Sequence, residues 1–215
     1  PECMLRAYFF VKDDTMEKLI ADIGSNLRFL GGAILIIGII FALAKLAERY
    51  MPQSRKVTST RRITIIAICG AIASILHILD FPLPFLAPGF YKLDFSELPV
   101  MLCGFYLGPS AAVFCEVLKI LLKLLLKGTS TAFVGDFANF AVGCSFVLPA
   151  IILYHLRKTR KGAVLALAAG TVILTIFGSA FNAIYLLPKF SELYGLPLDT
   201  IISMGSAVNA NVSNV

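Results

Sequence analysis

Three charged side chains, Glu116, Lys119 and Lys123, lie inside the otherwise largely apolar stretch 109–126. Glu116 and Lys119 are three residues apart, so in a helix they share one face and can form an ion pair. A charge at the centre of a membrane helix costs about 2.5 to 3.5 kcal/mol on insertion scales, and such residues usually pair or face the protein interior. Two interpretations stay open. Either this pair is internal while Lys123 and Lys127 extend towards the surface, or the pair contacts a ligand directly.

Two amide side chains, Asn139 and Asn182, also lie in apolar runs. An amide carries donors and an acceptor that need partners inside hydrocarbon. Such a residue either forms a hydrogen bond between helices or recognises an amide-like edge of a ligand. We expect both residues towards the outer side of the membrane, which favours the ligand interpretation.

Residue types that support catalysis or metal binding do not occur at useful spacings. His77 and His155 are far apart, and the five cysteines include no C-x-x-C pair. No H-E-x-x-H or G-x-S-x-G motif occurs. We therefore predict no catalytic residue, no metal site and no resident cofactor. One alternative of another class stays open, an integral membrane enzyme or assembly factor that uses Glu116 and Lys119.

The composition indicates which elements hold these residues. The 215 residues are 58% hydrophobic and only 15% charged, whereas soluble domains carry about 25% charged residues. Uncharged runs long enough to span a bilayer occupy residues 29–44, 63–79, 137–154 and 162–188. The chain is therefore predicted to be a multi-pass, all-α membrane protein.

The region between the second and third of these runs is irregular. Gly108 and Pro109 divide residues 96–127 into two pieces that are too short for two full crossings. The preceding segment, residues 81–95, is apolar and aromatic but contains three prolines that preclude a regular helix. We expect this loop to dip into the membrane and leave a cavity, because irregular backbone at that depth must be buried or line one.

Basic residues determine the predicted orientation. They gather in residues 45–62 and 157–161, which should both be cytoplasmic, while the proline-rich loop is nearly charge-balanced and lies outside. This alternation requires residues 96–126 to cross twice. Since topology explains the net charge of +6, we expect no nucleic-acid partner.

A pair of small residues, Ala67 and Ala71, is spaced for close helix contact. It either packs inside this subunit or docks on a separate membrane partner. At the other end, the uncharged residues 200–215 are expected to begin a spanning helix that is cut off.

Four segments resemble the riboflavin-specific substrate-binding subunit, or S-component, of energy-coupling factor (ECF) transporters. They are FPLPFLAPGFYKLDFSELP from residue 81, GPSAAVFCEVLK from 108, GDFANFAVGCSFVLPA from 135 and FNAIYLLPKF from 181. The resemblance implies a six-helix bundle, here with an extra N-terminal helix and a truncated last one. Residues 1–60 would be the extension with its basic connector, and residues 61–215 the substrate-binding domain.

The resemblance also implies a function without chemistry. The subunit would capture riboflavin, or another vitamin or a flavin such as FMN, at the bacterial plasma membrane. A coupling protein and two ATPases would complete the transporter, with Ala67 and Ala71 on the docking face. The external loop would lid the site and Asn182 would bind the flavin ring. The predicted ligand contacts are Leu86, Tyr91, Lys92, Leu93, Asp94, Phe95, Glu116, Lys119, Asn139, Asn182 and Tyr185.

Overall fold

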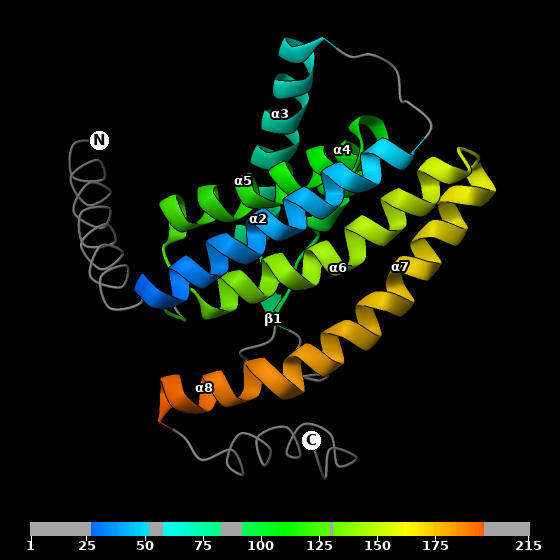
Figure 1. Cartoon of the computed structure of the whole chain (residues 1–215). Coiled ribbons are helices and arrows are strands. Elements are labelled where there is room, and N and C mark those ends of the chain that lie inside the picture. The colour runs from blue at the N-terminus through cyan, green and yellow to red at the C-terminus, as the bar shows by residue number, and fades with distance from the viewer. Residues whose placement is uncertain (1–26, 52–57, 83–91, 130, 196–215) are drawn as a thin grey trace, which may run out of the picture.

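The computed structural model describes residues 27–51, 58–82, 92–129 and 131–195 as a bundle of helices (Figure 1). The first two helices are α2 (Leu27–Tyr50) and α3 (Ser59–Ile78), and a short hairpin of β1 (Phe81–Pro82) and β2 (Lys92–Leu93) follows. The remaining elements are α4 (Glu97–Leu107), α5 (Pro109–Lys127), α6 (Val134–Leu156), α7 (Arg160–Phe181), the π-helix η1 (Asn182–Leu186) and α8 (Leu187–Tyr194).

Four helical segments within the described ranges are long and apolar enough to cross a membrane. They are Phe29–Tyr50, Ser59–Ile78, Val134–Leu156 and the continuous run Arg160–Ser191 through α7, η1 and part of α8. Each coincides, to within one residue at its ends, with or contains one of the four predicted uncharged runs, so these four predictions are confirmed. The predicted truncated helix at residues 200–215 lies outside the described residues.

The predicted break between α4 and α5 is also confirmed, and one residue makes the turn. Gly108 has φ +103°, a backbone conformation that favours glycine, and its N–H donates to Gly104 O at the end of α4. Pro109 then begins α5, at a position where its missing N–H is not needed. With 11 residues, α4 is only about 16 Å long. The double crossing of residues 96–126 remains a prediction.

Small side chains bring α3, α4, α5 and α6 close together. Gly104 of α4 lies against Ile151 of α6, where an added Cβ would overlap the isoleucine side chain. Ala, Cys, Val and Ile side chains from all four helices fill the rest of this core. Small side chains at these positions let the helix backbones approach closely. Its buried members include Ala73, Val100, Cys103, Ala111, Ala112, Cys115, Val147, Ala150 and Ile151.

The outer helices α2 and α7 cover different sides of this core. In Figure 1, α7 runs beside α6, and α2 packs on α5 and α6. Near its last turn, α2 is joined to the core by Glu48, whose Oε1 accepts hydrogen bonds from Ser110 N at 3.2 Å and Ser110 Oγ at 2.6 Å. Arg62 of α3 lies 3.6 Å from the same carboxylate. Helix α2 is therefore tied to the start of α5.

Candidate ligand-binding site

The candidate site lies at one end of the bundle, where α3 and α5 end and α6 begins. We call it the outer end, following the predicted orientation. Lys127 at the end of α5 donates hydrogen bonds to Asp80 Oδ1 and to Ile78 O. These two hydrogen bonds join the ends of α3 and α5. On the other side, the ring of Phe137 in α6 lies 6.3 Å from the ring of Tyr185 in η1. The outer end therefore gathers residues from four helical elements, α3, α5, α6 and η1.

Asp94 is held in place between β2 and α4. His77 Nδ1 lies 2.7 Å from Asp94 Oδ2, and Ser96 N donates to Asp94 Oδ1 at 2.8 Å. The second contact satisfies a backbone donor just before α4. Burial alone would raise the pKa of Asp94, but the hydrogen bonds from His77 and Ser96 outweigh it and lower the pKa to about 2.

Glu97, Glu116 and Lys119 form a buried charge cluster, a name kept for these three residues below. Lys119 Nζ lies 2.8 Å from Glu97 Oε1 and 2.7 Å from Glu116 Oε2. The side chains of Glu116 and Lys119 are fully buried, whereas that of Glu97 is 27% exposed. The internal pairing of Glu116 with Lys119 is thus present. Sequence reasoning missed Glu97 as a partner of this pair, because it comes from a different helix.

A second buried pair lies one turn further along α5. Lys123 Nζ contacts Asp136 Oδ1 on α6, and Thr129 Oγ1 donates to Asp136 Oδ2 at 2.8 Å. Lys123 therefore has a carboxylate partner instead of only extending towards the surface. At four-residue intervals, Lys119, Lys123 and Lys127 each face a carboxylate from another segment.

The two predicted asparagines lie on different elements of the outer end. Asn139 on α6 is half-buried, and its Oδ1 is buried with no hydrogen-bond partner in the described part of the chain. Asn182 is the first residue of η1, and the ring of Tyr185 in the same π-helix lies 5.0 Å from that of Phe181. Short π-helices inside α-helices are frequent at functional sites.

The loop residues of the predicted site are only partly described. Leu86 and Tyr91 lie outside the described residues. Lys92 and Leu93 form β2, in register with Pro82 and Phe81 of β1. Leu93 and Phe95 are exposed, and the ring of Phe95 lies 6.0 Å from that of Phe81. The hairpin therefore presents apolar side chains beside Asp94.

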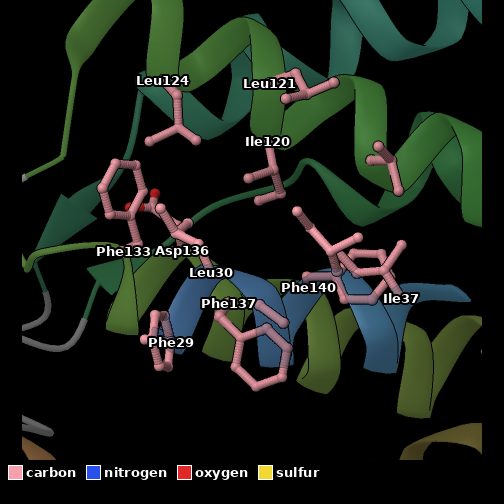
Figure 2. A pocket seen from close by; sticks show the side chains of 13 residues that line it. Phe29, Leu30, Ile37, Ile120, Leu121, Leu124, Phe133, Asp136, Phe137 and Phe140 are labelled. Carbon is pink, nitrogen blue, oxygen red and sulfur yellow. The ribbon is translucent and has the colours of Figure 1, made fainter. Parts of the chain in front are cut away.

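An apolar cavity of about 220 Å³ lies between α2, α5 and α6 (Figure 2). Figure 2 shows Phe29, Phe137 and Phe140 on one side of it and Ile120 and Leu124 on the other. Asp136 is the only charged residue among those that line it. Sequence reasoning missed this cavity because its walls come from three separate apolar helices whose packing no local pattern reveals.

The small residues Ala67 and Ala71 lie on the open side of α3. Ala67 is exposed and Ala71 is half-buried, whereas Gly70, Ala73 and Ser74 face the core. Exposed apolar side chains, Ile68 and Ile75, flank them. Ala67 and Ala71 are therefore not fully covered by packing inside the described bundle. Within the described ranges, no group of three or more His, Cys, Asp or Glu residues could hold a metal ion.

This fold and site define a multi-pass helical membrane protein with a polar and aromatic site at one end of the bundle. The chain belongs to the ECF transporter family of substrate-specific components, whose model it matches over residues 61–213. The predicted S-component resemblance and the all-helical membrane fold are thus confirmed. The family consists of transport subunits, which supports the prediction that the chain is not an enzyme. It also implies a transporter module as partner.

Relatives and a solved structure support the same assignment. The chain is 30% identical over 153 residues to the riboflavin transporter FmnP of Bacillus subtilis, a match that covers 71% of this chain and 80% of that protein. It is 36% identical over 136 residues to the riboflavin transporter RibU of Staphylococcus aureus, covering 63% and 70%. The solved structure of the S component of a bacterial ECF transporter is 32% identical, with a TM-score of 0.57 and coverage of 73% and 90%.

The charge cluster predicts a large difference between two lysines of α5. Lys119→Met leaves two carboxylates without their ammonium partner, and the expected loss of unfolding free energy is about 3 to 5 kcal/mol. Lys127→Met, the matched control, removes a 40% exposed lysine and should cost less than about 1 kcal/mol. Denaturant unfolding of both variants in detergent measures the difference, and equal losses would contradict it.

The His77–Asp94 contact predicts a dependence of stability on pH. The pKa of Asp94 is lowered from 3.8 to about 2, so its contribution is present above pH 4 and is lost as the pH falls towards 2. That shift corresponds to about 2 kcal/mol. Asp94→Asn should remove this contribution at neutral pH and flatten the stability profile between pH 4 and 2. Unfolding in detergent across this pH range measures it, and parallel profiles for both proteins would refute it.

Proposed function

We propose that this chain is the riboflavin-binding subunit of an ECF-type vitamin uptake transporter in the bacterial plasma membrane. The observation that carries the proposal is its identity of 30% and 36% to two proteins named as riboflavin transporters, across most of the family domain. The outer end supports riboflavin binding, since aromatic rings and buried polar atoms lie together there. A flat heteroaromatic ring with polar edges needs aromatic side chains against its faces and polar atoms at its edges.

In this proposal, each predicted site residue has a role in holding the ligand. Lys92, Leu93, Asp94 and Phe95 would cover the ligand together with the loop residues Leu86 and Tyr91. Asp94 would act from a fixed position, because His77 and Ser96 hold its carboxylate. Asn182 and Tyr185 would contact the ring from η1, and Asn139 from α6. Glu116 and Lys119 would contact the ligand deeper in the site.

Delivery would require the rest of the transporter. In this proposal a transmembrane coupling protein binds the open face of α3 at Ala67 and Ala71, and two ATPases supply the energy. Residues 61–215 would form the substrate-binding domain. Residues 1–60 would be an extension whose helix α2 rests on that domain through Glu48 and Ser110.

Riboflavin binding is tested by titrating the purified protein and following the quenching of flavin fluorescence. We expect a submicromolar dissociation constant, and Asn182→Ala should raise it about 10-fold because a polar contact to the ring is lost. Ser145→Ala is the control, since that hydroxyl donates to Val142 O of its own helix. Absence of submicromolar riboflavin binding to the wild-type protein would overturn the proposal. If FMN or another vitamin binds more tightly than riboflavin, that compound becomes the proposed ligand. The chain would still be a vitamin-binding S-component.

The docking role of α3 is tested by separating binding from uptake. Ala67→Phe adds a large ring to an exposed position, so the dissociation constant for riboflavin should stay unchanged. Riboflavin uptake by cells that carry the variant should fall to background, because a close helix approach is blocked. Ile176→Phe, at an exposed position of α7, is the comparison for bulk alone and should leave uptake normal. Normal uptake with Ala67→Phe would contradict docking at this face.

A further inference from the structure

Helix α2 contacts the neighbouring helices on both sides of the cavity in Figure 2. Near the start of α2, the ring of Phe29 lies 5.8 Å from the ring of Phe137 on α6. Beyond the cavity, the ring of Phe41 lies 4.7 Å from that of Phe114 on α5, and the carboxylate of Glu48 accepts hydrogen bonds from the start of α5. Because α2 is held on both sides, a simple tilt of this helix cannot close the cavity.

The cavity is long and narrow. Its wall runs from Phe29 to Ile37 on α2 and from Val117 to Leu124 on α5, so it extends about 12 Å along the helices. Its volume of about 220 Å³ over that length gives a mean cross-section of about 18 Å². A space of this shape fits a single extended hydrocarbon chain.

The wall of the cavity offers no free polar group to a ligand. Twelve of its 13 lining residues are apolar, and the remaining one, Asp136, already pairs with Lys123 and Thr129. Water and the polar edges of a vitamin would find no partner here, and apolar cavities of this kind stay dry. An apolar occupant is favourable, because an empty cavity would leave the wall side chains without packing partners.

The cavity reaches the surface of the bundle between α2 and α5. Two of its lining residues, Ile34 and Leu121, are 68% and 52% exposed. Since Phe29–Tyr50 is long and apolar enough to span the membrane, this surface faces lipid tails, which are as apolar as leucine side chains. An occupant therefore enters from the bilayer.

The cavity is distinct from the proposed vitamin site. Among the residues that the structure describes, no proposed vitamin contact lines it. One of its three walls is α2, which lies outside residues 61–213, the range that the family model matches. The cavity thus exists because α2 covers α5 and α6 in this chain.

We propose that this cavity binds one acyl chain of a membrane phospholipid, which enters laterally between Ile34 and Leu121. The chain fills the space beside the small side chain of Ala33 on α2 and packs against the ring of Phe140 on α6. The bound chain completes the contact between α2 and the other two helices. Helix α2 is then attached through lipid in its outer half and through Glu48 near its other end.

The test places a tryptophan in the cavity, since the chain has none. Phe140 lines the cavity but is only 2% exposed, so a tryptophan there touches lipid only through a chain inside the cavity. Phe140→Trp is reconstituted in vesicles of dioleoylphosphatidylcholine, or of the same lipid with brominated chains, whose bromine atoms quench tryptophan on contact. We expect brominated lipid to reduce its fluorescence nearly as strongly as that of Leu35→Trp, the matched variant at a 62% exposed position of α2.

Filling the cavity provides the control. Ala33→Phe puts a ring into the space that the chain would occupy. Combined with Phe140→Trp, it should remove most of the quenching, whereas combined with Leu35→Trp it should leave the quenching unchanged. The dissociation constant for riboflavin should be the same in Ala33→Phe as in the wild-type protein.

Three results would overturn the proposal. The first is quenching of Leu35→Trp without quenching of Phe140→Trp, because no acyl chain would then enter the cavity. The second is quenching of Phe140→Trp that persists with Ala33→Phe, because lipid would then reach the ring by another path. The third is weaker riboflavin binding by Ala33→Phe, because the cavity would then belong to the vitamin site. Should Phe140→Trp not fold, Phe137→Trp on the same wall replaces it with the same expected results.

Discussion

The structure depends on the requirement that every charge inside an apolar bundle has a partner. α5 carries Lys119, Lys123 and Lys127 at four-residue intervals, and each meets a carboxylate from a different segment. An ammonium in a low-dielectric interior is acceptable only with such a partner. The three contacts therefore fix how α4, α6 and the segment after α3 lie along α5. The apolar core adds a position-specific contact of its own, since Ile151 of α6 lies against Gly104 of α4.

The small residues and the charges have complementary effects. Gly104 and Gly143 permit close approach between helices, and Gly143 also gives the two carboxylates of the charge cluster their space. Close approach is what brings Glu97 on α4 within reach of Lys119 on α5. The site is consequently built on rigid helices at its inner side and on the hairpin at its outer side. Binding sites positioned by a rigid scaffold and closed by a loop are common.

Much of the fold was predictable, because long apolar runs and the Gly108–Pro109 break are local signals. The Glu116–Lys119 pair was predictable for the same reason, since its spacing lies within one helix. The partners from other helices were not. Glu97, Asp136 and His77 become parts of the site only through packing between segments that are distant in the sequence. The cavity in Figure 2 was missed on the same ground, because three apolar helices form it together.

The length of the helical run from Arg160 to Ser191 has a consequence for the surrounding lipid. Its 32 residues span about 48 Å, well beyond a hydrocarbon core about 30 Å thick. Membrane helices tilt by at most about 40°, and even that tilt cannot bury so long a run. Part of it must therefore stand in the headgroup region, where Lys189 can meet water. Asn182 and Tyr185 of η1 precede Lys189 by only seven and four residues, so they lie close to this boundary between hydrocarbon and headgroups.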